Sequence, residues 1–140
     1  MEKNPKVSVV MPVFNSEKYV GEAIESILDQ TYHDFEFIIV DDCSSDGSPG
    51  IIDRYRRRDA RIIVIRNKER SGISESRNTG INRSRGLLIM NMDHDDVSEK
   101  SRMMMQVRFL DENPDVGIVG SSVIAIDEHG NRIGRRTLPK

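Results

Sequence analysis

The sequence has a single cysteine, Cys43, and no long hydrophobic run. One cysteine excludes an internal disulfide framework and is typical of a protein in a reducing compartment. No apolar stretch approaches the roughly 20 residues that span a bilayer. The start, MEKNPKVSVV, has neither a secretory apolar region nor a small-residue cleavage site. We therefore expect a cytoplasmic protein without a transmembrane segment.

The sequence also has no large excess of positive or of negative residues. The 140 residues include 21 Lys and Arg and 23 Asp and Glu, for a formal net charge of -2. This balance argues against a nucleic-acid-binding protein that relies on a general positive field. Hydrophobic residues make up 36% of the chain, enough to form the core of one globular domain over residues 1–140.

Several common ligand-binding motifs are absent. The chain has no G-x-G-x-x-G and no G-x-x-x-x-G-K-[ST], the two commonest nucleotide-binding patterns. An EF-hand loop counted from Asp93 would need Gly and Glu where the chain has Ser98 and Met104. A signalling receiver domain would need acids at the end of its first strand, which here reads MPVFN.

Apolar strands and amphipathic helices alternate along the chain. We predict strands at residues 6–13, 35–40, 61–66, 87–92 and 116–126, the last with a possible break near Ser121, and helices within residues 15–30, 44–59, 71–86 and 98–114. Asn15 or Ser16 could cap the first helix, and a hairpin turn is expected around Gly130. Near-continuous apolar strands between helices are typical of an α/β fold, with a mostly parallel sheet and helices on both faces.

Three of the predicted strands end in polar segments: PVFNSE, DDCSSDG and DHDD. In open α/β sheets, ligands bind outside the carboxyl ends of the strands. Asp93, Asp95 and Asp96 lie so close in sequence that a cation would relieve their repulsion. Mg²⁺ and Mn²⁺ favour carboxylate oxygens, and Mg²⁺ is usually held by one or two carboxylates plus substrate phosphates. The alternative interpretation is a solvated acidic turn.

The segment VDDCSSDGS is a second candidate site. Asp41 or Asp42 could accept a hydrogen bond from a base N–H or a ribose hydroxyl. Alternatively, Asp46 and Gly47 reverse the chain and Asp42 accepts backbone hydrogen bonds. Cys43 has no histidine near it in the sequence that could act as a base, so a packed or loop thiol is the better interpretation.

Together, these features resemble the family-2 glycosyltransferases, whose catalytic domain has the Rossmann-like GT-A fold. Three stretches carry the resemblance: VSVVMPVFNSEKYVGEAIESILDQTYHDFEFIIVDDCSSDGS, SGISESRNTGINRSRG and LLIMNMDHDD, between residues 7 and 96. The resemblance implies a truncated GT-A domain whose residues 1–140 form the part that binds the nucleotide-sugar. It also implies an inverting, metal-dependent glycosyltransferase of the hexosyltransferase type. The donor would be a UDP-sugar, and the acceptor a saccharide or a lipid-linked molecule.

The resemblance also implies roles for individual residues. The wall of the nucleotide pocket would be formed by Pro12, Phe14, Asn15 and Glu17. Asp42, preceded by Asp41, would hydrogen-bond uracil, and Arg77 in SRN would lie near the nucleotide.

In the same comparison, Asp93 and Asp95 match the family's D-x-D pair. Asp93 would meet ribose or the metal, and Asp95 would bind the Mg²⁺ or Mn²⁺ that bridges the diphosphate. Asp96 could share that role. His94 stands where the family usually has a small residue. We expect it to be a loop side chain that points outward, and an extra metal ligand is the alternative.

The chain stops before the part that supplies the acceptor site and the general base in the family, so no general base is assigned. A nucleotide-binding module or fragment without transferase activity is therefore the alternative function. A cluster of arginines begins near the end of the second predicted helix, and a solvated helix face is its favoured interpretation. Attraction to anionic lipids at the inner face of the membrane is the alternative. The cluster comprises Arg54, Arg56, Arg57, Arg58 and Arg61.

Overall fold

The structure, a computed structural model, describes residues 4–137. The chain divides into two compact units at Lys100 and Ser101. The first unit contains β1 (Val7–Val13), α1 (Val20–Leu28), β2 (Phe35–Asp41), α2 (Ser48–Arg56), β3 (Ile62–Arg66), α3 (Ile73–Arg83) and β4 (Leu88–Asn91). The second contains α4 (Arg102–Glu112), β5 (Val123–Ile126) and β6 (Arg132–Arg136).

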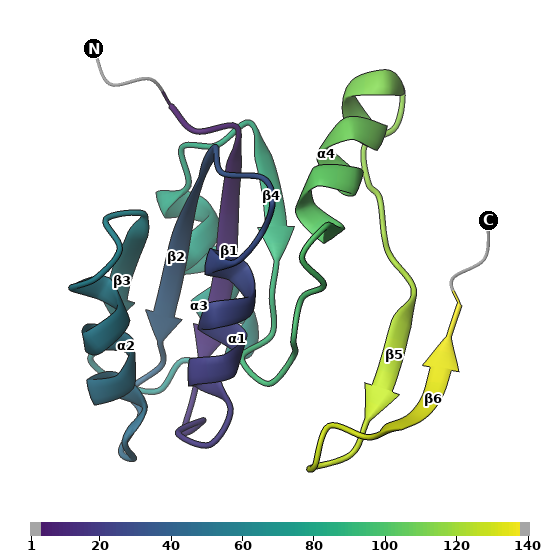
Figure 1. The fold of residues 1–140 in the computed structure, drawn as a ribbon. Helices are drawn as coiled ribbons and strands as arrows, with labels where there is room; N and C mark the ends of the chain where they lie inside the picture. Colours follow the sequence, from purple (N-terminus) through teal and green to yellow (C-terminus); the bar gives the residue numbers. More distant parts are fainter. Residues whose placement is uncertain (1–3, 138–140) are drawn as a thin grey trace. The chain divides into compact units, whose positions relative to one another are not determined.

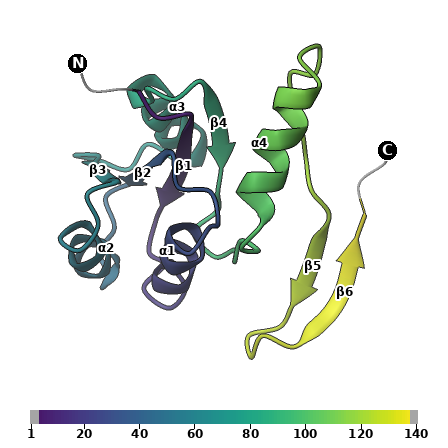
Figure 2. The ribbon, with the colours of Figure 1, turned by 45° about the horizontal axis from the view of Figure 1, so that its top comes forward.

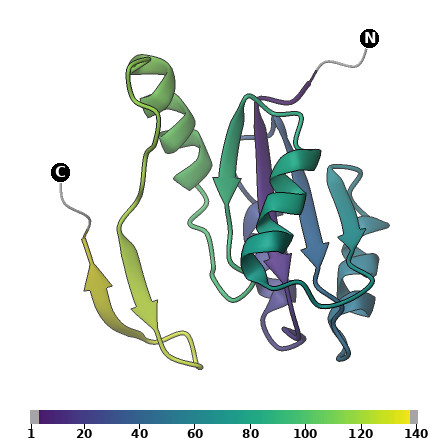
Figure 3. The same cartoon turned by 180° about the vertical axis from the view of Figure 1, so that it is seen from behind.

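The first unit is built on a four-stranded parallel sheet with the order β3-β2-β1-β4. In the central strand β1, Val7 pairs with Phe35 on one side and with Leu88 on the other. Helices α1 and α2 lie on one face of this sheet and α3 lies on the opposite face (Figures 1 and 3). The tilted view separates these three layers (Figure 2). The prediction of a parallel α/β sheet with helices on both faces is confirmed.

The core explains why the first two strands are so apolar in sequence. Every residue of β1 and β2 is buried, because both strands are central and helices cover both of their faces. Helix α1 buries one stripe, formed by Val20, Ala23, Ile24 and Ile27, which recurs at the three- and four-residue spacing of a helix.

Helix α3 approaches the sheet closely at Gly80. A Cβ atom added there would lie 2.4 Å from Cγ1 of Val10 and 3.2 Å from Cγ2 of Val40. Any side chain would push α3 away from β1 and β2. Glycine is therefore needed at this position for steric reasons.

Replacing Gly80 by alanine is expected to lower the free energy of unfolding by about 1–3 kcal/mol, the usual cost of overpacking a core. Gly50→Ala in α2 is the matched control, because a Cβ atom there would have no neighbour within 4 Å. The control should be neutral or stabilising, by up to about 1 kcal/mol, through the higher helix propensity of alanine. Urea unfolding of both variants measures the difference; equal stabilities would contradict the prediction.

A buried carboxylate fixes the entry into β4 at the end of the sheet away from the acidic loops. Glu36 Oε1 accepts hydrogen bonds from Ser8 Oγ at 2.7 Å and from the Arg85 backbone N–H at 2.7 Å. Arg85 also forms an ion pair with Oε2 at 2.9 Å. Burial raises the pKa of Glu36, but these hydrogen bonds and the Arg85 charge outweigh it and lower the pKa below its ordinary value. The charged form of Glu36 therefore holds the segment before β4 against β1 and β2.

Two predicted elements differ from the structure. Helix α1 begins at Val20 with Tyr19 as its N-cap, so the cap predicted at Asn15 or Ser16 is wrong. The Asn15 side chain instead accepts a hydrogen bond from the Ser45 backbone N–H at 2.9 Å.

The strand predicted at residues 116–126 is also partly wrong. Within this range the strand is Val123–Ile126, after the break expected near Ser121, and it pairs antiparallel with β6 instead of extending the parallel sheet. All residues of β5 and β6 are exposed. Neither strand therefore has a buried apolar face that would determine its position in a sheet. The hairpin turn predicted around Gly130 is confirmed: its φ is 80°, and its N–H donates to the Asp127 carbonyl at 3.0 Å.

Candidate nucleotide-binding site

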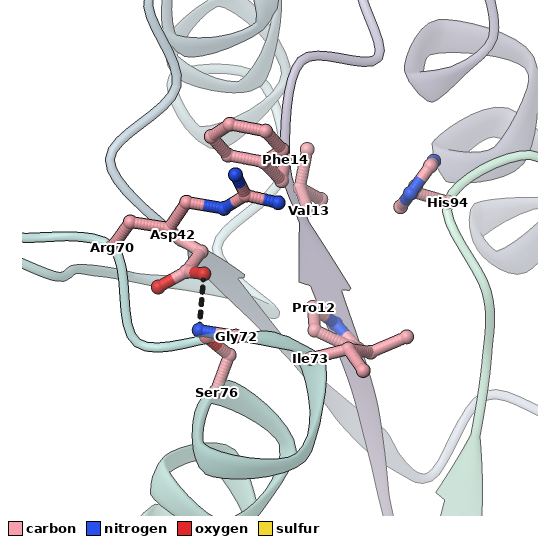
Figure 4. Close-up of a pocket in the computed structure, with 9 residues that line it drawn as sticks. All are labelled: Pro12, Val13, Phe14, Asp42, Arg70, Gly72, Ile73, Ser76 and His94. Atoms are coloured by element: carbon pink, nitrogen blue, oxygen red, sulfur yellow. Dashed lines mark hydrogen bonds between the residues drawn. The ribbon is translucent and has the colours of Figure 1, made fainter.

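A pocket of about 250 Å³ lies at the carboxyl ends of the parallel strands. It is lined by Pro12, Val13, Phe14, Asp42, Arg70, Gly72, Ile73, Ser76 and His94. These residues come from β1 and the segment after it, the residue that follows β2, the loop before α3, α3 itself and the loop after β4 (Figure 4). The sheet edge predicted to carry a site therefore has a cavity.

Asp42 organises one wall of this pocket. Its Oδ1 accepts hydrogen bonds from Asn67 Nδ2 at 2.7 Å and from the Ser71 N–H and Oγ at 2.8 Å each. Its Oδ2 accepts from the Gly72 N–H at 2.8 Å. The buried carboxylate thus holds both ends of the segment 67–72, which we call the 67–72 loop.

The pKa of Asp42 reflects this role. Burial raises it, but the hydrogen bonds from Asn67, Ser71 and Gly72 outweigh burial and hold the pKa far below the ordinary aspartate value. Asp42 is therefore ionised at neutral pH. Since three of the four hydrogen bonds fall on Oδ1, Oδ2 retains acceptor capacity toward the pocket.

The 67–72 loop places Arg70 over Phe14. The guanidinium carbon of Arg70 lies 4.0 Å from the centre of the Phe14 ring, which is a cation–π contact. Phe14 is half-buried and its ring faces the pocket beside Arg70 (Figure 4). An aromatic face and a cation therefore adjoin Asp42, an arrangement that suits a flat, polar ring.

Asn15 and Glu17 lie outside the pocket lining and join the segment after β1 to the turn after β2. The Asn15 N–H donates to Ser44 Oγ at 3.0 Å, and the Glu17 N–H donates to Asp46 Oδ2 at 3.0 Å. Glu17 Oε2 accepts from the Gly47 N–H at 2.7 Å. These bonds hold the two loops together, so both residues stabilise the segments next to the pocket without lining it.

Asp41 also lies outside the lining. It is buried at the end of β2, where its Oδ1 accepts the Ser44 N–H at 3.1 Å and its Oδ2 lies 3.8 Å from Arg66 Nε. The neighbouring acids Asp41 and Asp42 thus have different surroundings: Asp41 shapes the turn, whereas Asp42 faces the pocket.

The acidic loop after β4 is open to solvent. Asp93, Asp95 and Asp96 are exposed, and Arg77 Nη2 of α3 donates to Asp93 Oδ1 at 2.8 Å. Within residues 4–137, no three His, Cys, Asp or Glu side chains gather closely enough to form a metal site made of protein ligands alone. Exposed carboxylates can still hold a cation jointly with phosphate oxygens, as Mg²⁺ usually requires.

Several lining residues could not be found by sequence reasoning. Arg70, Ile73 and His94 have no signal in their own segments that marks a pocket, and their positions depend on loop closure. His94, expected to point outward, is instead half-buried against the pocket, and its Nδ1 is buried without a hydrogen-bond partner. Three of the predicted nucleotide-binding residues, Pro12, Phe14 and Asp42, do line the pocket.

Known proteins resemble this chain over most of its length. Residues 8–139 match the protein family described as Glycosyl transferase family 2. An uncharacterized glycosyltransferase of Methanocaldococcus jannaschii, MJ1057, is 43% identical over 129 residues, covering 91% of this chain and 44% of that protein. Glycosyltransferase GlyG of Streptococcus pneumoniae is 32% identical over 125 residues, covering 89% of this chain and 42% of GlyG. The chain thus spans less than half the length of these relatives.

Solved structures of glycosyltransferases also resemble this chain. S. aureus TarS 1–349 in complex with UDP-GlcNAc has a TM-score of 0.74 at 32% identity, covering 78% of this chain and 32% of that one. A mannosyltransferase of Pyrobaculum calidifontis, PcManGT, solved with GDP-Man and Mn²⁺, shares the fold with a TM-score of 0.74 at 23% identity, covering 90% of this chain and 36% of PcManGT. The parallel sheet is therefore that of the GT-A glycosyltransferases, and the chain belongs to glycosyl transferase family 2.

Proposed function

We propose that this chain binds the nucleotide-sugar donor of a glycosyltransferase in the pocket between Phe14, Asp42 and His94. The observation that carries the proposal is the pairing of an aromatic face at Phe14 with an ionised acceptor at Asp42. A pyrimidine base would pack against Phe14 and Arg70 and donate its ring N–H to Asp42 Oδ2. The likeness to TarS, solved with UDP and with UDP-GlcNAc, supports a UDP-sugar as the donor.

A divalent cation, Mg²⁺ or Mn²⁺, completes the proposed site. Asp95 is its first candidate ligand because it is exposed and lies in the acidic loop beside the pocket residue His94. Asp93 already shares one oxygen with Arg77, so it would contribute its other oxygen or contact ribose, and Asp96 could add a carboxylate. The cation would offset the negative charge of the diphosphate leaving group.

The proposed reaction is transfer of a hexosyl group with inversion at the anomeric carbon. An acceptor hydroxyl of a saccharide or lipid-linked molecule would attack that carbon as the bond to the diphosphate breaks. A base would take the hydroxyl proton, and we assign that base to none of these 140 residues. Arg77 would balance the charge of Asp93 while the diphosphate departs.

No helix in residues 4–137 is long and apolar enough to cross a bilayer. A cytoplasmic location, and attachment at the inner face of the membrane, remain predictions. In the arginine cluster, Arg61 pairs with Asp59 at 2.7 Å and stacks on Phe35 at 4.3 Å. That arginine is therefore already engaged within the fold.

Calorimetric titration of UDP into the 140-residue chain tests the proposal. We expect binding in Mg²⁺ or Mn²⁺ that weakens markedly in EDTA. GDP and ADP serve as comparison ligands and should bind more weakly than UDP. Failure of all three nucleotides to bind in Mn²⁺ would overturn the proposal.

A nucleotide-binding module without transferase activity is the second candidate function. We keep it because no residue of the chain is assigned as the general base. Slow release of sugar from UDP-sugar to water would indicate a working donor site. Tight binding without any release would favour the module.

A further inference from the structure

His94 occupies the side of the pocket opposite Asp42 and Arg70 (Figure 4). Its backbone carbonyl accepts a long hydrogen bond from Ser16 Oγ at 3.4 Å. Two residues earlier, the Met92 N–H donates to the Val10 carbonyl at 3.0 Å. The loop that carries His94 is therefore tied to β1 and the segment after it, and the imidazole is held at the pocket.

The polar groups of the lining differ in how far the protein itself satisfies them. Asp42 accepts four hydrogen bonds, and Ser76 Oγ accepts one from Asn67 Nδ2 at 3.1 Å. By contrast, His94 Nδ1 is buried without a partner. Buried polar atoms are nearly always hydrogen-bonded, and an exception calls for an explanation.

A second unpartnered nitrogen lies close to this end of the site. Arg77 Nε is buried without a hydrogen-bond partner, while Nη2 of the same guanidinium holds Asp93, the residue before His94. Arg77 and His94 both offer N–H groups, whereas the neighbouring Asp93 and Asp95 can only accept hydrogen bonds when ionised. An oxygen-rich anion in the pocket would offer acceptors to the N–H groups of these two side chains that reach it.

We propose that His94 is a ligand-contacting residue of the donor site and that its imidazole donates a hydrogen bond to an oxygen of the nucleoside diphosphate. The inference rests on the proposed function, because it assigns the diphosphate to the side of the pocket near the acidic loop. The nucleoside would occupy the side formed by Phe14 and Asp42. In the sequence, His94 lies between Asp93 and Asp95, so it adds a hydrogen-bond donor beside the two carboxylates proposed to hold the cation.

Calorimetry with two probes, UDP and uridine, tests this assignment in the presence of Mg²⁺. His94→Ala should weaken UDP binding about tenfold or more, as expected for loss of a hydrogen bond to a charged group, and should leave uridine binding unchanged. His94→Gln should recover part of the loss, since its amide can still donate. His33→Ala is the matched control, because His33 is exposed and away from the pocket lining.

NMR measurement of the imidazole ¹⁵N resonances provides a second test. It uses wild-type protein, so its outcome does not depend on whether a variant folds. In wild-type protein, the His94 signals should shift on addition of UDP and stay in place on addition of uridine. Equal weakening of UDP and uridine by His94→Ala, or unchanged UDP binding, would overturn the diphosphate assignment while leaving the proposed function intact. Wild-type protein that binds neither probe would overturn the proposed function, and this inference with it.

Discussion

Replacing Asp95 by alanine is expected to abolish the Mg²⁺-dependent part of UDP binding. The dissociation constant of the variant in saturating Mg²⁺ should rise to the value that wild-type protein shows in EDTA. A cation held by few protein ligands depends strongly on each one, because no three-ligand cluster exists among residues 4–137 to compensate. The loss should reach at least tenfold, since even outer-shell partners of a metal site contribute about that much.

Asp115→Ala is the matched control for this experiment. Asp115 is exposed in the segment after α4, so its removal changes the net charge equally without touching the acidic loop. The control should retain full Mg²⁺ dependence. Wild-type affinity of Asp95→Ala in Mg²⁺ would remove Asp95 from the metal site and leave Asp93 or Asp96 as its candidates.

Replacing Asp42 by asparagine is expected to lower the free energy of unfolding by about 3 kcal/mol and to abolish UDP binding. The amide group cannot accept on both sides of the side chain, so at least one N–H of the 67–72 loop loses its partner. Losing a buried hydrogen bond to a charged group costs about 1.5–3 kcal/mol, and the remaining bonds would weaken with the charge. Urea unfolding and calorimetry measure the two effects.

The pH dependence provides an internal check on this prediction. The pKa of Asp42 is lower in the folded state than in the unfolded state, where it is about 3.9. Its contribution to stability is therefore complete from about pH 5 upward and is lost progressively as the pH falls through about 4 and below. The difference between wild-type protein and Asp42→Asn should shrink between pH 5 and pH 3. Asp29→Asn, an exposed control, should stay within about 0.5 kcal/mol at every pH.

Sequence reasoning succeeded where one physical signal was dominant. The buried residues of β1 and β2 form uninterrupted apolar runs, and such runs between helices are compatible with few architectures other than a parallel sheet. Because the carboxyl ends of parallel strands share an edge, the topology brought the segments that carry Phe14 and Asp42 together, and the family resemblance assigned both residues to the nucleotide pocket.

Sequence reasoning failed for residues whose positions depend on contacts between loops that are distant in the sequence. Arg70 reaches Phe14 only because Asp42 holds the 67–72 loop through its backbone N–H groups, and no pattern in the sequence records those bonds. The apolar residues between 116 and 126 carry a strand signal without any information on the partner strand. The exposed hairpin of β5 and β6 shows how little such a signal specifies.

The strand order has a consequence for how the protein folds. β1 pairs with β2 through a short crossover, but its pairing with β4 joins Val7 to Leu88, so most of the first unit must be synthesised before that pair can form. Contacts between residues so distant in sequence raise the contact order and slow folding, because loop closure is costly before the contacts form. The two sides of the pocket, one from β1 and β2 and the other from the loop after β4, would therefore meet late. Until then, the edge of β1 would be open to pairing with another chain, so aggregation during refolding should compete with formation of the site.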